Sequence, residues 1–227
     1  MIYAVLLMAG KGTRCQTFDF KQYEKINNID LFSYPLNTLL TVDDIDNIVL
    51  VVDNDHFEYV NKTINNIKTN KNIYITIGGS TRKESVYNAL KYIDSFNNCE
   101  YVLIHDAARF LISKEIILNS LSAVKKYNAT TCYIDAIDTI ALKKDDKYID
   151  KYLNREKIIK IQTPQCFKFD IILKAHQELD DNYFDDCSLI NKLNKDIYLV
   201  KGDEKNFKVT TQLDLHLGEI LVNKNEK

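Results

Sequence analysis

A glycine-containing, cationic loop follows the first apolar segment of the chain. Residues 2–7 (IYAVLL) lead into residues 10–14 (GKGTR), and Lys21 follows seven residues after Arg14. The chain has only six glycines in 227 residues, and two of them lie in this loop. Glycine lets the backbone turn sharply and bring its N–H groups close to an anion, and crowded cations repel one another unless an anion lies among them. The spacing therefore predicts a phosphate-binding loop.

Two common nucleotide-binding motifs do not match this loop. A Walker A loop needs a Gly-Lys-Thr order that is missing here, and the dinucleotide fingerprint needs a third glycine where Cys15 stands. An ordinary strand-to-helix turn that happens to contain glycine is the alternative. The crowding of Lys11, Arg14 and Lys21 argues against that alternative.

Two later segments also place polar side chains directly after apolar runs of strand length. Residues 78–86 (GGSTRKESV) predict a flat backbone surface for a ring, with a hydroxyl at a helix start. Residues 102–109 (VLIHDAAR) place Asp106, which can ligate Mg²⁺ or hold a ribose hydroxyl, and Arg109, which offers a fork for a second phosphate. The alternatives are a plain strand-to-helix connection and a surface salt bridge. His105 is expected to be a structural hydrogen-bonding partner.

Two motifs in the second half of the chain carry less information on their own. Residues 162–165 (QTPQ) contain one of only two prolines, and residues 206–210 (NFKVT) place Lys208 shortly before an expected helix. A lysine in such a context is usually solvated, so neither motif is diagnostic alone.

The apolar pattern predicts an α/β protein that positions these motifs at one edge of a sheet. Helices are expected to begin at Thr81, Ser113 and Thr211, with a capping box between Thr81 and Glu84. Strand-length runs that alternate with helices favour a mostly parallel sheet covered on both faces, which binds ligands at the carboxyl ends of its strands. The expected strands are residues 2–7, 48–52, 73–77, 101–104, 131–134 and 197–200.

One stretch departs from this alternation. Residues 137–160 contain two short extended runs around a charged turn, which predicts a β-hairpin arm that projects from the core. The sequence shows no linker and no internal repeat, so residues 1–227 are expected to form a single domain.

Composition excludes several classes of protein. A net charge of −2 and a pI of about 6.1 give no positive field for nucleic acid. The five cysteines are scattered and never in CxxC spacing, which argues against a zinc site or a disulfide framework and fits a reducing cytoplasm. The longest apolar runs, six or seven residues, are too short to span a membrane, and no signal peptide is visible. A cytoplasmic protein is expected.

Taken in order, these segments resemble the cytidylyltransferase family that makes 4-diphosphocytidyl-2-C-methyl-D-erythritol in the non-mevalonate isoprenoid pathway. The loop GKGTR with Lys21 is shared with the wider nucleotidyltransferase superfamily. The segments GGSTRKESV, HDAAR, DTI, QTPQ and NFKVT narrow the resemblance to this branch, and it covers nearly the whole chain.

The resemblance implies a Rossmann-like nucleotidyltransferase fold, a homodimer built through the arm, and Mg²⁺-dependent attack of a sugar-alcohol phosphate on the α-phosphate of CTP. It implies catalytic roles for Arg14, Lys21, Arg155 and Lys208. It implies CTP contacts for Ala9, Gly10, Lys11, Gly12, Thr13, Gly79, Arg82, Ser85 and Asp106, and it assigns the metal to Asp106. It implies substrate contacts for Arg109, Thr139 and Thr163, with Thr139 and Arg155 reaching in from the arm of a partner subunit.

Three positions depart from the family pattern. Ser80 replaces a common acidic residue, Phe184 replaces a threonine that bears on substrate choice, and residues 28–30 (NID) replace a Gly-Lys-Pro turn. A ribitol-5-phosphate cytidylyltransferase is the nearest alternative, because the opening MIYA and the GKGTR loop resemble that group too. A non-catalytic nucleotide-binding module is a further alternative, but such a module tends to lose the charged residues that this chain retains.

Overall fold

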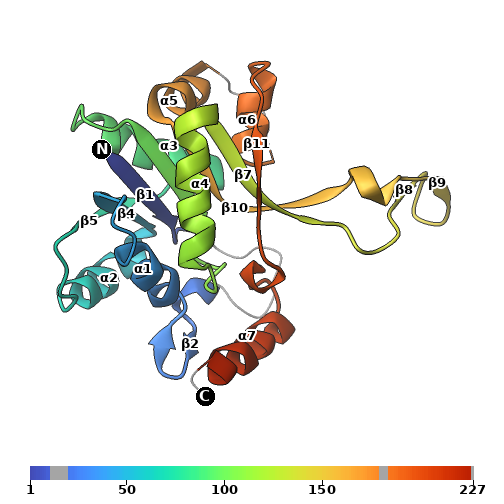
Figure 1. Ribbon diagram of the computed structural model, residues 1–227. Helices are drawn as coiled ribbons and strands as arrows, with labels where there is room; N and C mark the ends of the chain where they lie inside the picture. Colours follow the sequence, from blue (N-terminus) through green and yellow to red (C-terminus); the bar gives the residue numbers. More distant parts are fainter. Residues whose placement is uncertain (11–19, 179–183, 226–227) are drawn as a thin grey trace.

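The computed structural model describes residues 1–10, 20–178 and 184–225. A seven-stranded sheet lies at its centre, with the strand order β5-β4-β1-β6-β10-β7-β11 (Figure 1). Neighbouring strands are parallel except for β10, which runs antiparallel to both β6 and β7. The predicted mostly parallel sheet is thus confirmed. The strands are β1 Ile2–Leu7, β4 Asn47–Val52, β5 Asn72–Ile77, β6 Tyr101–Asp106, β7 Ala129–Asp135, β10 Ile159–Lys168 and β11 Tyr198–Lys201.

Strand β10 was not predicted, and its sequence explains why. It contains Pro164 and three polar residues that are nevertheless buried, Gln162, Thr163 and Gln165. The register against β7 shifts between Gln162 and Gln165, and the Thr163–Pro164 peptide bond is cis. Proline cannot donate to a strand ladder and is accommodated at such irregularities. The strand is therefore hidden from a reading based on apolar runs.

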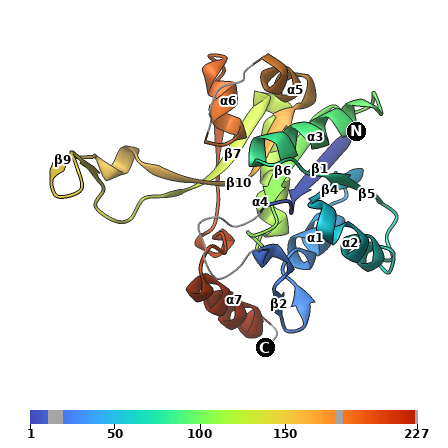
Figure 2. The same cartoon turned by 180° about the vertical axis from the view of Figure 1, so that it is seen from behind.

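Helices cover both faces of the sheet (Figures 1 and 2). Alternate residues of β1 point to opposite faces: Ala4 and Leu6 pack with α1 and α4, whereas Tyr3 and Val5 pack with α3, α5 and α6. None of the helices in the described ranges is long and apolar enough to cross a membrane. The helices are α1 Ser33–Leu40, α2 Phe57–Ile64, α3 Arg82–Asp94, α4 Lys114–Tyr127, α5 Phe169–Glu178, α6 Asp186–Lys192 and α7 Gln212–Asn225.

Side-chain caps fix the starts of α3 and α4 as predicted. The Thr81 hydroxyl accepts a hydrogen bond from the Glu84 N–H at 3.1 Å, and the Ser113 hydroxyl accepts one from the Ile116 N–H at 3.3 Å. Each cap satisfies a backbone donor that the helix itself leaves unpaired.

The predicted arm is a two-stranded antiparallel hairpin of β8 Ala141–Lys143 and β9 Ile149–Tyr152. It extends away from the sheet between β7 and β10 (Figures 1 and 2). Its apolar side chains are exposed in the single chain, and these include Ile137, Tyr148 and Tyr152.

Short elements complete the described chain. A small antiparallel pair, β2 Lys25–Ile26 and β3 Ile29–Asp30, packs through Ile26 with α7 in a separate apolar cluster. The 3₁₀ turns are η1 Lys21–Tyr23, η2 Asn54–His56, η3 Arg155–Lys157 and η4 Glu204–Asn206.

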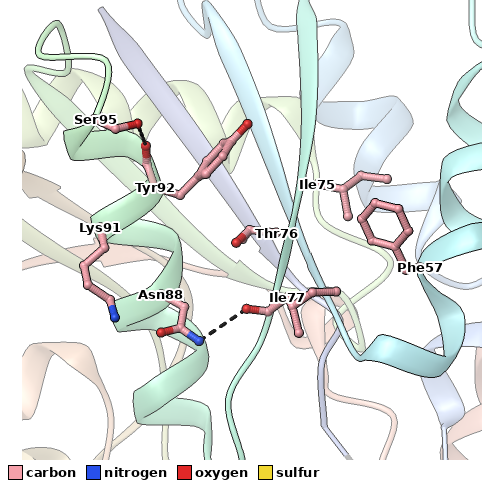
Figure 3. A pocket seen from close by; sticks show the side chains of 8 residues that line it. All are labelled: Phe57, Ile75, Thr76, Ile77, Asn88, Lys91, Tyr92 and Ser95. Atoms are coloured by element: carbon pink, nitrogen blue, oxygen red, sulfur yellow. Dashed lines mark hydrogen bonds between the residues drawn. The ribbon is translucent and has the colours of Figure 1, made fainter.

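An open pocket of about 660 Å³ lies beside the edge strand β5 (Figure 3). Ile75 and Ile77 line it from β5, and Asn88 and Tyr92 line it from α3. The amide of Asn88 donates to the carbonyl of Ile77 at 3.3 Å and joins the helix to the strand. This pocket shares no residue with the polar cluster described next.

Candidate active site

The chain reverses its direction of travel across the sheet between β1 and β6. It adds β4 and β5 on one side of β1, and then returns to place β6 on the other side. Leu7 at the end of β1 lies opposite Asp106 at the end of β6, and the Ala107 N–H donates to the Leu7 carbonyl at 3.0 Å. Ligands in open α/β sheets bind at such a reversal, outside the carboxyl ends of the strands. The structure therefore places residues 105–109 (HDAAR) at the expected edge.

Asp106 is the centre of a buried charge cluster at this edge. Its carboxylate accepts from the Lys208 ammonium at 2.6 Å and from the Arg82 Nε at 3.3 Å. Burial alone would raise the pKa of Asp106, but Lys208 and Arg82 lower it well below its usual range. The carboxylate is therefore ionised at neutral pH, and two cations from distant parts of the sequence are fixed beside it.

Arg82 binds a second carboxylate, which sequence reasoning missed. Its Nη1 donates to Asp186 at 2.8 Å, and the opposite oxygen of Asp186 lies 3.3 Å from His176 Nε2. Burial alone would lower the pKa of Arg82, but Asp186 and Asp106 raise it. Asp186 is 0% exposed, and only this burial distinguishes it from the exposed acidic residues of the chain. The sequence therefore carried no signal for it.

Arg109 is held by backbone carbonyls. Its guanidinium donates to the carbonyls of Asn206 at 3.0 Å and Ile161 at 3.4 Å, while its Nε has no partner among the described residues. The side-chain amide of Asn206 donates in turn to the Thr163 carbonyl at 2.8 Å. Asn206 is completely buried and joins three predicted motifs, yet it was not predicted to be a site residue.

Apolar anchors beside the charged residues fix their backbones. Phe110 and Val209 directly follow Arg109 and Lys208 in the chain, and both are buried in the cluster that contains Ile26 and Val222. The Val209 N–H also donates to the Ala108 carbonyl at 2.9 Å. The segments that carry Arg109 and Lys208 are therefore locked together.

The glycine pair lies against the end of β1. A Cβ on Gly78 would lie 2.3 Å from the Ala9 Cβ, so only glycine permits this approach. The Gly79 N–H donates to the Ser85 hydroxyl at 3.1 Å, and this hydroxyl donates to the Thr81 carbonyl at 2.9 Å. Ala9, Gly79 and Ser85 are thus brought together, and Gly78 joins them as a residue that was not predicted.

The beginning of the cationic loop is attached to η1, which contains Lys21. The side-chain amide of the next residue, Gln22, donates to the carbonyls of Met8 and Gly10. Lys21 therefore begins a turn that is tied to the end of β1. The predicted residues Lys11, Gly12, Thr13 and Arg14 lie outside the described residues.

The two site residues predicted on the arm are not part of the Asp106 cluster of the same chain. Thr139 is exposed, and the Arg155 guanidinium donates to the Ile137 carbonyl at 3.3 Å within the arm. The arm itself extends away from the sheet (Figure 2).

Two of the three positions that depart from the family pattern lie just before helices. The Ser80 hydroxyl and N–H both donate to the Glu84 carboxylate at 2.6 Å, so this residue stabilises the start of α3. Phe184 is 100% exposed and contacts α6 through a hydrogen bond from its N–H to the Ser188 hydroxyl at 3.0 Å.

Comparison with known proteins gives one consistent result. The model of the family described as 2-C-methyl-D-erythritol 4-phosphate cytidylyltransferase matches residues 2–224. A protein of that name from Clostridium botulinum strain 657 is 38% identical over 97% of this chain and 96% of its own length. A Clostridium novyi relative of the same name is 37% identical over 96% of this chain and 95% of its own length.

Solved structures agree with this result. The crystal structure of a 4-diphosphocytidyl-2C-methyl-D-erythritol synthase from Anaerococcus prevotii has a TM-score of 0.86 at 27% identity and covers 98% of both chains. The Francisella tularensis 2-C-methyl-D-erythritol 4-phosphate cytidylyltransferase has a TM-score of 0.78 at 27% identity, over 96% of this chain and 98% of its own. The chain belongs to the 2-C-methyl-D-erythritol 4-phosphate cytidylyltransferase family.

Proposed function

We propose that this chain transfers CMP from CTP to 2-C-methyl-D-erythritol 4-phosphate and releases pyrophosphate, a step of isoprenoid precursor biosynthesis. The observation that supports this most strongly is the Asp106–Lys208–Arg82 cluster at the sheet reversal, in a chain that matches the family from end to end. The whole chain of 227 residues then acts as one nucleotidyltransferase domain.

The reaction needs charge stabilisation more than covalent help from the protein. An oxygen of the acceptor phosphate forms a bond to the α-phosphorus of CTP, and the bond from that phosphorus to the β-phosphate oxygen breaks. Negative charge builds on the α-phosphate oxygens and on the departing pyrophosphate, so fixed cations lower the barrier. Arg14 and Lys21 would neutralise this charge. Residues 10–13 would cradle the phosphates through their backbone.

The remaining candidate site residues divide between the cytidine of CTP and the acceptor. Ala9, Gly79 and Ser85 would contact the cytosine and ribose, because they form a close-packed surface beside the end of β1. Arg109 and Lys208 would hold the acceptor, and Arg82 and Thr163 would fix the position of Asp106 between the two substrates.

A homodimer would supply the rest of the acceptor site. The exposed apolar side chains of the arm need a partner, and Thr139 and Arg155 lie on that arm. A second copy of the chain would bury the apolar side chains and bring these two polar residues to the first copy's acceptor phosphate.

The residues fit a Mg²⁺ ion that arrives with the triphosphate. Within the described residues no cluster of three or more His, Cys, Asp or Glu could hold a metal alone. Mg²⁺ commonly takes one carboxylate together with phosphate oxygens and water, and the ionised Asp106 offers that carboxylate. When bound, the ion would neutralise phosphate charge.

We place this activity in the cytoplasm. The four cysteines in the described ranges are all free thiols, as expected in a reducing compartment.

A comparison of acceptors tests the proposal. Pyrophosphate release from CTP with Mg²⁺ is measured with 2-C-methyl-D-erythritol 4-phosphate, ribitol 5-phosphate and glycerol 3-phosphate. We expect the highest kcat/KM with the first acceptor. A preference for ribitol 5-phosphate would replace the proposed acceptor, and no release with any of the three would overturn the enzymatic function.

A further inference from the structure

His105 is a buried imidazole whose two nitrogens have different partners. It lies in β6, is 1% exposed, and is not used by the proposed reaction. Its Nε2 is 3.0 Å from the Arg109 carbonyl oxygen, and its Nδ1 is 3.0 Å from the Thr163 hydroxyl. A carbonyl oxygen can only accept, so Nε2 carries the hydrogen and a neutral imidazole accepts the Thr163 hydroxyl hydrogen at Nδ1.

The Thr163 hydroxyl links this ring to Asp106. Its single hydrogen is committed to His105, so its oxygen is free to accept from the Asp106 N–H at 3.1 Å. The hydroxyl therefore holds the backbone of Asp106 at the end of β6. Removing the acceptor at Nδ1 would leave the hydroxyl without a fixed orientation.

Residues 106–109 form a turn at the end of β6, and the second ring nitrogen of His105, Nε2, holds the far end of this turn. The Arg109 N–H donates to the Asp106 carbonyl at 2.9 Å and closes the turn, and the Arg109 carbonyl accepts from His105 Nε2. One imidazole thus holds the first residue of the turn through Thr163 and the last residue directly. The side chains of these two end residues carry the carboxylate and the guanidinium of the candidate site.

We propose that His105 is a positioning residue that fixes the Asp106–Arg109 turn from both ends. It so places the Arg109 guanidinium for the acceptor phosphate and the Asp106 carboxylate between the two substrates. This inference rests on the proposed function, which assigns Arg109 to the acceptor and places Asp106 between the two substrates. It predicts that loss of either hydrogen bond weakens use of the acceptor more than binding of CTP.

Two substitutions separate the two hydrogen bonds. The side-chain oxygen of His105→Asn takes the place of Nδ1 and keeps the acceptor for Thr163, but it removes the donor to Arg109. The side-chain nitrogen of His105→Gln takes the place of Nε2 and keeps the donor to Arg109, but it removes the acceptor for Thr163. We expect each variant to raise KM for the acceptor about fivefold to tenfold, the effect of one lost hydrogen bond, with KM for CTP within about twofold.

Thr163→Val tests the hydrogen bond between the Thr163 hydroxyl and His105 Nδ1 by removing the hydroxyl. The double variant His105→Gln/Thr163→Val should be no worse than the poorer single variant, because both changes remove one interaction. Val124→Ala is the matched control for lost stability, since Val124 is buried in α4 within the apolar core. The inference would be overturned if Val124→Ala raised KM for the acceptor as much as the His105 variants do. It would also be overturned if the effects of the two single changes on this KM multiplied in the double variant.

A spectroscopic measurement is independent of turnover and of whether the variants fold. NMR of the unsubstituted protein with ¹⁵N-labelled histidine should show the His105 ring as one neutral tautomer with its hydrogen on Nε2. A hydrogen on Nδ1, or exchange between both tautomers, would overturn the positioning role. Failure of the proposed function is distinguishable, because then the unsubstituted protein itself releases no pyrophosphate with the acceptor.

Discussion

At the scale of single residues, Asp106 joins parts of the chain that lie far apart in sequence. It pairs with Arg82 and with Lys208, which is 102 residues away, and its backbone N–H is held by Thr163. A buried carboxylate with two cations remains ionised and fixed in place. The cluster therefore holds its charged groups in fixed positions, and fixed charge is what catalysis of phosphoryl transfer uses.

Replacing Lys208 tests whether this charge contributes to the reaction. We expect Lys208→Ala to lower kcat by about 10²–10³, the usual effect of removing one group that stabilises transition-state charge. Lys205→Ala is the matched control, because Lys205 lies three residues earlier and is exposed. Steady-state kinetics with both substrates would contradict the assignment if the two variants had similar turnover.

His105 also predicts how stability depends on pH. Burial lowers its pKa from 6.5 to about 4 in the folded chain, so the unfolded chain takes up a proton first as the pH falls. The contribution of neutral His105 to the free energy of unfolding should therefore be fully present above about pH 6.5. It should be lost progressively as the pH falls to about 4. His105→Gln removes this titration. Between about pH 6.5 and pH 4, urea unfolding should therefore show a smaller fall in the free energy of unfolding for the variant than for the unsubstituted protein, by on the order of 1–3 kcal/mol.

The exposed His216 provides the control for this measurement. Comparison of His216→Gln with the unsubstituted protein measures the effect of replacing a histidine that is not buried. If His105→Gln follows the pH dependence of the unsubstituted protein, burial does not lower the pKa of the His105 imidazole in the folded chain.

At the scale of elements, the start of α3 connects Gly79 and Ser85, which are proposed to contact CTP, to the charge cluster around Asp106. Thr81 caps the helix, Arg82 begins it, and Ser85 turns back to hold Gly79. A loosened cap would therefore displace two groups that are assigned to CTP.

Two N-cap variants separate this effect from simple loss of stability. Thr81→Ala and Ser113→Ala should each lower the free energy of unfolding by about 1 kcal/mol, because each removes a similar cap. Only Thr81→Ala should raise KM for CTP, since the α4 cap contacts no predicted CTP residue. An equal change of KM in both variants would show that the start of α3 does not position the nucleotide.

The elements also show what the sequence could predict. The apolar runs gave the positions of six strands to within two residues at each end, because short continuous apolar runs bounded by polar residues are typical of strands in a parallel sheet that is covered on both faces. The end of β6 was placed two residues early, because His105 and Asp106 are polar residues that continue a buried strand. Strand β10 was missed because Pro164 and buried glutamines conceal it. Asp186 and Asn206 were missed because their importance comes from burial, which becomes visible only after distant segments have packed.

At the scale of the whole molecule, two residues assigned to the acceptor lie away from the other candidate site residues of the same chain. Thr139 and Arg155 lie on an arm that extends away from the sheet of its own chain (Figure 1). A shared site in a homodimer therefore follows from the proposed function.

Subunit mixing tests this arrangement. Arg155→Ala and Lys21→Ala should each be inactive alone, but a heterodimer of the two has one intact site. An equal mixture should recover about a quarter of normal activity, because about half of all dimers are heterodimers and each heterodimer has one intact site of two. Lys157→Ala, in the same exposed turn of the arm, is the control and should remain active. No recovery, with heterodimers shown to form, would mean that each site is made within one chain.

The central claim is that the site at the sheet reversal joins the α-phosphate of CTP to a polyol phosphate. Identification of the product tests it most directly: the protein is incubated with CTP, Mg²⁺ and 2-C-methyl-D-erythritol 4-phosphate, and the mixture is examined by ³¹P NMR and mass spectrometry. The account predicts one cytidine diphosphate-linked polyol and one pyrophosphate for each acceptor consumed. Unchanged CTP, or hydrolysis of CTP with no linked product, would contradict it.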